Sequence, residues 1–343
     1  MNKIALLGFG GTIGMVPGSS GALVPAKNIE DLITFVPGLA NLADIQLIQL
    51  ENRDSTNISP DHWSSLAMKI WSLKDQVDAI IVTHGTDTMA YTASAISIAL
   101  GGSVSIPVVF TGSQLPIAEP GNDARFNLEN SVKTAIRATR EGIAEVMIVF
   151  SDKALRANRT IKTSESRFDA FDSPAFPYLG QITASGVIFN PIAMKASNNQ
   201  ENNTNPSFEF NREIFAVDVV PGLDPEIIRS VIATGRCRAL LLKSLGAGNV
   251  PSEGQYSLLP VIEEFTSKNI PVLISTKFVG GRTIPDMYEP GKQALQAGAI
   301  PTNDMTDVAA QVKLMWLLAK GFTSIENLKY DMLHSYVGEV GQT

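Results

Sequence analysis

The chain has 343 residues, more than one hydrophobic core normally supports, so two packed units are predicted. Apolar residues make up 44% and charged residues 18%, a composition typical of globular proteins and not of disordered or fibrous chains. The net charge of −7, without a Lys/Arg-rich run, disfavours nucleic acid as a partner. A single cysteine excludes an intrachain disulfide and a cysteine-based zinc cluster, and it fits a reducing compartment.

Neither a signal peptide nor a membrane span is recognisable in the sequence. The opening run MNKIALLGFGG has a short apolar stretch and no small-x-small cleavage site, and it reads as a strand. The most apolar long window, Ala95–Thr111, is interrupted by glycines, serines and Pro107. We therefore expect a cytoplasmic protein with no membrane association.

Strand-like and helical patterns alternate along the first half of the chain, which predicts a mostly parallel sheet flanked by helices. Ser59 and Thr88 are the expected caps of two of the helices. The predicted strands are Lys3–Leu7, Ile45–Leu50, Asp78–Thr83, Ile106–Phe110 and Glu145–Phe150, and the predicted helices are Pro60–Leu73, Met89–Leu100 and Asn122–Arg140.

The stretch ASNNQENNTNP, residues 196–206, is too polar to offset the entropy of ordering by burial, and it marks a linker. After it the alternation resumes, with the last helical pair beginning near Asn303. We predict an N-terminal α/β catalytic domain at residues 1–190, a linker at 191–213 and a smaller α/β domain at 214–343 that is doubly wound and flavodoxin-like. Its predicted elements are Phe215–Val220, Pro225–Thr234, Ala239–Lys243, Gly254–Lys268 and Pro271–Ser275.

Two strand ends carry the residues with the clearest chemistry. The first strand runs into a glycine-rich loop around Thr12, and glycines let a backbone approach a ligand closely. The third strand runs into Thr86 and Asp87 just before a helix, whose N-terminus favours negative charge. If the sheet is parallel, both loops emerge at one edge, and two hydroxyls near fixed donors suit acyl transfer.

A third candidate is Lys162, in the polar run Arg156–Thr163. Lysine can act as a base when it is desolvated or paired with another group. Taken without its context, a lysine is more often a solvated surface residue. Sequence alone leaves open whether Lys162 reaches Thr86.

Four segments together resemble the bacterial-type L-asparaginase family, and especially its cytoplasmic type I branch. They are GGTIGM at Gly10–Met15, THGTDTMAYTASA at Thr83–Ala95, TGSQLP at Thr111–Pro116 and the NRTIK…FDAF segment at Asn158–Phe171. The likeness extends over essentially the whole chain. It implies hydrolysis of L-asparagine to L-aspartate and ammonia through an acyl-enzyme intermediate, without a cofactor or metal.

The resemblance also implies roles for individual residues. Thr12 would be the nucleophile, while Thr86, Asp87 and Lys162 would form a second hydrogen-bonded group that activates the attacking water or the nucleophile. The residues implied in substrate binding are Ser55, Thr56, Gly85, Asp87 and the backbone of Ser113.

Asn249 and Glu289 resemble positions that a neighbouring subunit supplies to the pocket, although a surface role for Glu289 is equally compatible with the sequence. The family assembles as intimate dimers that often pair into tetramers, so a homo-oligomer with a two-fold interface is expected.

The sequence departs from the family pattern in the loop after the first motif. Family members usually carry a tyrosine there that helps to activate the nucleophile, whereas this loop reads GSSGALVP at residues 18–25 and the first tyrosine of the chain is Tyr91. A homologue that keeps the pocket but has weak or no turnover is therefore one alternative. Another is the asparaginase-like subunit of archaeal amidotransferases, but its extra N-terminal barrel is not expected here, since the first motif begins at Gly8.

Simpler interpretations exist for the same motifs. A dinucleotide-binding turn at residues 8–14 is disfavoured because Ile13 stands where the third glycine belongs. Thr83–Thr88, taken alone, is compatible with a plain capped turn. His84 is more typical of a packed histidine than of a base, and three histidines in the chain disfavour a Ser-His-Asp triad or a histidine zinc site.

Overall fold

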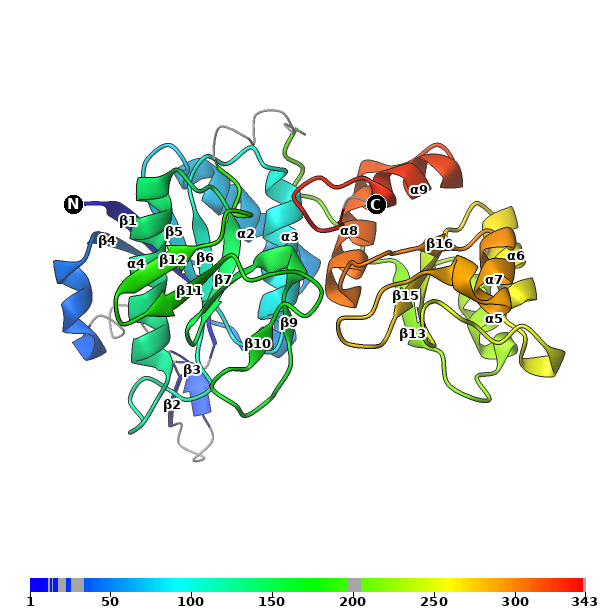
Figure 1. Cartoon of the computed structure of the whole chain (residues 1–343), viewed down its shortest axis with the longest axis horizontal. Helices are drawn as coiled ribbons and strands as arrows, with labels where there is room; N and C mark the ends of the chain where they lie inside the picture. The colour runs from blue at the N-terminus through cyan, green and yellow to red at the C-terminus, as the bar shows by residue number, and fades with distance from the viewer. Residues whose placement is uncertain (12, 14, 18–22, 26–33, 196–204, 342–343) are drawn as a thin grey trace. The chain divides into compact units, whose positions relative to one another are not determined.

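The computed structural model describes residues 1–11, 13, 15–17, 23–25, 34–195 and 205–341. It divides into two compact units, Met1–Phe208 and Glu209–Thr343. The predicted α/β class is confirmed, because the first unit has a large, mainly parallel sheet and the second a separate, smaller parallel sheet (Figure 1). The predicted linker contains residues 196–204, which lie outside the described residues.

The first unit contains an eight-stranded sheet in the order β12-β11-β8-β7-β6-β5-β1-β4. Its strands are β1 (Lys3–Gly8), β4 (Asp44–Gln49), β5 (Ala79–Thr83), β6 (Val108–Thr111), β7 (Val146–Phe150), β8 (Lys153–Arg156), β11 (Gly180–Thr183) and β12 (Gly186–Phe189). Two small antiparallel pairs accompany it, β2 (Met15–Pro17) with β3 (Leu23–Pro25) and β9 (Ile161–Lys162) with β10 (Phe171–Asp172). The helices are α2 (Pro60–Leu73), α3 (Met89–Leu100) and α4 (Ala124–Glu141), with 3-10 turns η2 (Pro37–Asn41), η3 (Ser55–Asn57) and η4 (Ala157–Arg159).

The central strands of this sheet are buried on both faces. Alternate residues such as Ile4, Leu6 and Val109 pack with Leu128 and Val132 of α4 in one apolar cluster. The residues between them point to the other face, where α3 covers β6 and β7 and α2 packs beside α3 (Figure 1). This explains why β1 and β5 read as continuous apolar runs in the sequence, since strands covered on both faces need apolar side chains in both directions.

The observed helix ends agree closely with the sequence pattern, with one difference in detail. The helices α2 and α3 have the predicted bounds, and α3 ends on Gly101, whose φ of 57° suits a left-handed C-cap. Thr88 stands at the N-cap position of α3, but its side chain accepts no capping hydrogen bond; its Oγ1 instead donates to the carbonyl oxygen of Ser55 at 2.7 Å. Thr88 therefore joins two loops instead of capping its helix.

The second unit has a four-stranded parallel sheet in the order β13-β14-β15-β16. Its strands are β13 (Ile214–Asp218), β14 (Ala239–Ser244), β15 (Val272–Thr276) and β16 (Ile300–Pro301). Its helices are α5 (Pro225–Ala233), α6 (Leu259–Ser267), α7 (Glu289–Gln296), α8 (Asp307–Lys320) and α9 (Ile325–Leu333), with 3-10 turns η6 (Gly254–Tyr256) and η7 (Pro285–Met287). Helices α5, α6 and α7 cover one face of the sheet and α8 packs on the other (Figure 1).

The flavodoxin-like strand order, expected in the smaller domain, is found in the larger one. Its five parallel strands, numbered along the chain, run 2-1-3-4-5, as β4-β1-β5-β6-β7. The four strands described in the second unit follow each other sequentially and do not reverse. The apolar pattern of a strand indicates that the strand is buried, but it does not indicate which strand lies beside it. The order of the strands in each sheet could therefore not be predicted from the sequence.

A buried ion pair fixes the C-terminal segment of the second unit. Nζ of Lys313, on α8, lies 2.6 Å from Oε1 of Glu339, and both side chains are fully buried. Lys313 also donates to the carbonyl oxygens of Met332 and His334, and the Glu339 carboxylate accepts the backbone N–H groups of Tyr336 and Val337. Such complete hydrogen bonding is what lets two buried charges persist.

Lys313→Met is expected to lower the free energy of unfolding by about 3–5 kcal/mol, because it leaves the Glu339 carboxylate buried without its counter-charge. The double variant Lys313→Met/Glu339→Gln should recover much of that loss, since the introduced amide is neutral and still accepts backbone hydrogen bonds. Chemical denaturation of the two variants and the wild type measures both effects. A single variant as stable as the wild type would contradict the structural role of the pair.

Candidate active site

The predicted loops meet at the point where the strand order of the large sheet reverses. β1 has β4 on one side and β5 on the other, and all three strands run parallel. The loops after these strands therefore leave the same edge of the sheet. Open α/β sheets bind ligands at this switch point, because the connections on either side diverge and leave a crevice.

The loop after β1 touches the loops after both neighbouring strands. Gly10 and Gly11 have φ values of 95° and 99°, a region that favours glycine. A Cβ on Gly11 would overlap the backbone nitrogen of Gly85, and one on Gly10 would overlap the carbonyl oxygen of Arg53. Both glycines are thus required by close backbone contact. Thr12, which follows Gly11, lies outside the described residues.

Three of the predicted catalytic residues form one hydrogen-bonded group. Nζ of Lys162 lies 2.8 Å from Oγ1 of Thr86 and 2.7 Å from Oδ1 of Asp87. Thr86 is buried, the Lys162 side chain is 17% exposed and the Asp87 side chain is 57% exposed. The lysine thus links a buried hydroxyl to a carboxylate that faces solvent just before helix α3.

Lys162 reaches Thr86 from a separate arm of the fold. It lies in β9, where it pairs with Phe171 of β10, and the Phe171 ring packs 4.9 Å from that of Phe150 in β7. Upstream, the guanidinium groups of Arg156 and Arg159 lie 4.6 Å and 5.0 Å from the ring of Phe176. Arg156 also forms a buried ion pair with Glu145 at 2.7 Å. These contacts anchor the turn η4 that leads into β9.

The loop after β4 brings Ser55 against the loop after β5. A Cβ on Gly85 would lie 2.6 Å from Oγ of Ser55, so glycine is needed at this position for the two loops to meet. Ser55 is buried, whereas Thr56 is exposed and its hydroxyl and backbone N–H both donate to Oδ1 of Asp54 at 2.8 Å. The predicted substrate-binding residues Ser55 and Gly85 are therefore in contact beside Thr86.

Gln114, within the TGSQLP motif, was not among the predicted site residues. Oγ1 of Thr86 lies 3.3 Å from Oε1 of Gln114. Its neighbour Ser113 is buried, and the Ser113 hydroxyl donates to the carbonyl oxygen of Leu115 at 2.6 Å. The motif identified this loop as part of the site, but only the three-dimensional structure brings the side chain of Gln114 to Thr86.

Asn249 and Glu289 belong to the second unit. Asn249 closes a turn by pairing with Leu245, and its Oδ1 is buried without a hydrogen-bond partner among the described residues. Glu289 is the first residue of α7, a helix that the sequence pattern did not predict, and its exposed carboxylate accepts from Gln293. Both residues therefore belong to a different unit from the one that contains Thr86.

His84 is a packed histidine, as its sequence context favours. It is 1% exposed, and its ring lies 5.5 Å from that of Phe9 and 6.4 Å from that of Phe110. Its Nδ1 lies 2.7 Å from the carbonyl oxygen of Gly85, which can only accept, so Nδ1 carries the proton. Burial lowers the pKa of His84 from 6.5 to about 4. The neutral ring therefore holds the Gly85 peptide just before Thr86.

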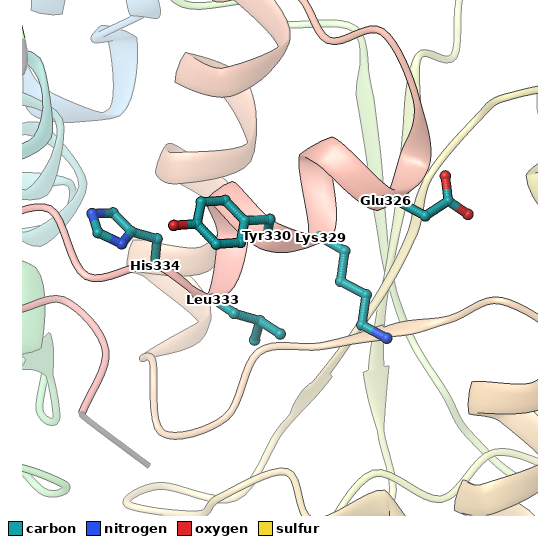
Figure 2. Close-up of a pocket in the computed structure, with 5 residues that line it drawn as sticks. All are labelled: Glu326, Lys329, Tyr330, Leu333 and His334. Carbon is teal, nitrogen blue, oxygen red and sulfur yellow. The ribbon is translucent and has the colours of Figure 1, made fainter.

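A hollow of about 500 Å³ lies on α9 in the second unit, and none of the predicted site residues lines it. Figure 2 shows its lining side chains, among which the rings of Tyr330 and His334 stack with centroids 6.0 Å apart. Its lining residues are Glu326, Lys329, Tyr330, Leu333 and His334.

Two further features concern only the part of the chain that the structure describes. No group of three or more His, Cys, Asp or Glu side chains within it could hold a metal ion. Of its helices, none combines the length and the apolar character that crossing a membrane requires.

The fold and the site together place a hydroxyl, a lysine and a carboxylate in contact at the switch point of an α/β sheet, and these are the kinds of side chain that acyl-transfer enzymes use. Residues 3–194 match the family model described as "Asparaginase, N-terminal", and residues 213–330 match the one described as "Glutaminase/Asparaginase C-terminal domain". The chain belongs to the asparaginase family, a group of amidohydrolases, as its motifs predicted.

Individual relatives agree with this assignment. The chain is 34% identical to the L-asparaginase of Thermococcus kodakarensis over 98% of this chain and 99% of the relative. The solved structure of that L-asparaginase matches with a TM-score of 0.86 at 31% identity, covering 99% of this chain and 100% of that chain. L-asparaginase I of Vibrio cholerae matches with a TM-score of 0.84 at 29% identity, covering 99% of each chain. A glutamyl-tRNA(Gln) amidotransferase subunit of Aeropyrum pernix is 32% identical over 99% of this chain and 80% of the relative.

The buried, neutral state of His84 predicts a dependence of stability on pH. As the pH falls from 6.5 towards 4, the unfolded chain takes up a proton at His84 that the folded protein does not. The His84 contribution is therefore fully present above pH 6.5 and is lost as the pH falls through 4, by up to about 3 kcal/mol.

Chemical denaturation at several pH values, with the wild type beside His84→Gln, measures this contribution. The stability difference between the two proteins should shrink as the pH is lowered through that window. A difference that stays constant with pH would contradict the assigned burial of the neutral ring.

Proposed function

We propose that the protein is an L-asparaginase that hydrolyses L-asparagine to L-aspartate and ammonia. The observation that carries the proposal is the contact of Lys162 with both Thr86 and Asp87. A hydroxyl assists acyl transfer only when a neighbouring group fixes the position of its proton. In this cluster, Lys162 is the group next to the Thr86 hydroxyl. Full-length similarity to an L-asparaginase supports the choice of asparagine as the substrate.

In the proposed reaction, Oγ1 of Thr12 attacks the side-chain amide carbon of asparagine. The C–N bond then breaks, the amide nitrogen takes up a proton and leaves as ammonia, and an ester joins the aspartyl group to Thr12. Water hydrolyses this ester and releases aspartate. The proton of the Thr12 hydroxyl ends on the leaving nitrogen, and one proton of the water returns to Thr12. Thr86, Asp87 and Lys162 bind and orient the attacking groups during both steps.

The substrate's charged groups have partners in the same place. Asp87 is sufficiently exposed to meet the α-ammonium group while it holds Lys162. The N-terminus of α3 and the hydroxyl of Ser55 present hydrogen-bond donors for the α-carboxylate. Thr56 borders the same position, with its own donors held by Asp54. We assign the side-chain amide of the substrate to a position beside the backbone of Ser113 and the peptide at Gly85.

We also propose that the active form is a cytoplasmic homo-oligomer, a two-fold dimer or a pair of such dimers, in which a partner supplies Asn249 and Glu289. The unpaired Oδ1 of Asn249, judged among the described residues, supports a ligand role for this side chain.

The loop at 277–288 leads into Glu289, and it contacts the turn of Asn249 through a hydrogen bond from Ile284 N to Ala247 O at 2.7 Å. Its exposed apolar side chains are Phe278, Val279, Ile284, Met287 and Tyr288. Exposed patches of this kind mark protein interfaces.

Two observations favour other functions. The loop at residues 18–25 lacks the tyrosine that the family usually carries, which supports a pocket-retaining homologue with weak turnover. The amidotransferase subunits among the relatives support a role in amide transfer instead of free hydrolysis. Ammonia release measured with asparagine, with glutamine and with buffer alone discriminates among these functions.

Thr12→Ala and Thr86→Ala should each lower ammonia release from asparagine by about a hundredfold or more, because each removes a hydroxyl that takes part in acyl transfer. The matched control is Thr234→Ala, which removes an exposed hydroxyl from the end of α5 in the second unit. Circular dichroism should show an intact fold for all three variants. If either active-site variant kept most of its activity, the role of that threonine would be refuted.

Met287→Asp should lower the molar mass measured by light scattering, because it places a charge in the proposed apolar interface. Activity should fall with it, since the partner's residues leave the pocket. The control Ile227→Asp changes a side chain on α5 that is 59% exposed, as Met287 is 58% exposed, and it should keep both the mass and the activity. An unchanged mass for Met287→Asp would count against this surface.

A further inference from the structure

The hydroxyl of Thr86 lies between two side chains of opposite hydrogen-bonding character. The Lys162 ammonium group, 2.8 Å away, can only donate, and Oε1 of Gln114, 3.3 Å away, can only accept. When both hydrogen bonds form, the Thr86 proton must therefore point to Gln114, and one lone pair of Oγ1 accepts from Lys162. The other lone pair of Oγ1 stays available for a third neighbour.

We propose that Gln114 is a positioning residue that fixes the direction of the Thr86 proton, so that Thr86 presents a lone pair to the attacking hydroxyl or water. If the Thr86 hydroxyl could rotate freely, it could donate a hydrogen bond to the oxygen of the nucleophile. That hydrogen bond would occupy the lone pair with which the nucleophile attacks. The inference rests on the proposed asparaginase function. It assigns a role, exerted through Thr86, to a side chain outside the group of Thr86, Asp87 and Lys162.

The amide of Gln114 is held in the orientation that this role requires. Its Nε2 donates to the carbonyl oxygen of Arg167 at 3.1 Å, which leaves Oε1 facing Thr86. If the amide were rotated by half a turn, its NH2 group would face the Thr86 oxygen, which already accepts from Lys162. Its oxygen would then face the carbonyl oxygen of Arg167, and two oxygens without a proton cannot form a hydrogen bond.

The backbone of Gln114 is fixed as well. Its N–H lies 3.1 Å and 3.0 Å from the two oxygens of Asp123, a carboxylate that is 7% exposed. The same carboxylate accepts from Leu115 N and from Nδ2 of Asn127, which also donates to the carbonyl oxygen of Gly112. The side chain of Gln114 thus extends from a rigid loop whose anchoring bonds do not involve that side chain.

Comparison of Gln114→Met with Gln114→Glu tests the inference. Both variants lose the donor to Arg167 and keep the backbone anchor, but only glutamate keeps an acceptor for Thr86. For asparagine hydrolysis, Gln114→Met should lower kcat by about ten- to a hundredfold with KM within about twofold of wild type. Gln114→Glu should recover most of this loss at a pH where its carboxylate is ionised, and its kcat should fall as the pH drops and that carboxylate takes up a proton.

A matched substitution, Gln76→Met on an exposed side chain after α2, should keep the wild-type kcat. Wild-type kcat in Gln114→Met overturns the inference. An equal loss in Gln114→Glu at every pH also overturns it, because the loss then comes from the Arg167 contact or from packing. A wild-type protein that releases no ammonia from asparagine refutes the proposed function instead, so the two failures are distinguishable.

Discussion

The parallel pairing of β1 with β5 is the constraint on which the site depends. In this register Gly8 lies opposite Thr83, and the next N–H, that of Phe9, donates to the Thr83 carbonyl oxygen at 3.0 Å. The two loops therefore begin at the same height and at the same sheet edge. The close contact of Gly11 with Gly85 follows directly, because neither loop has a side chain that would separate them.

The electrostatic character of the site follows from where its charges come to lie. The lysine and the carboxylate of the cluster come from separate segments and meet at the buried Thr86, with the carboxylate open to solvent. Just behind them, burial between two aromatic rings keeps His84 neutral, so this ring adds no second positive charge beside Lys162.

Much of this arrangement could be predicted from the sequence, and the remainder has identifiable physical reasons. The starts of α2 and α3 followed from the residues at their N-cap positions, Ser59 and Thr88, and the α/β class followed from the alternation of strands and helices. The helix α7 was missed because its eight residues carry few apolar side chains. The contacts of Gln114 could not be foreseen, since they join residues from three segments distant in sequence. The predictions for Thr12 and the loop tip at 18–22 stay predictions, because those residues lie outside the described part of the chain.

The buried pair of Lys313 and Glu339 has a consequence for protein synthesis. Glu339 belongs to the last stretch of the described chain to be translated, whereas Lys313 belongs to a helix made earlier. Until the later stretch has left the ribosome, the helix carries an ammonium group whose carboxylate counterion does not yet exist. A nascent chain halted before that point would expose an incompletely packed helix to cellular proteases, so this small core can close only after Glu339 has been translated.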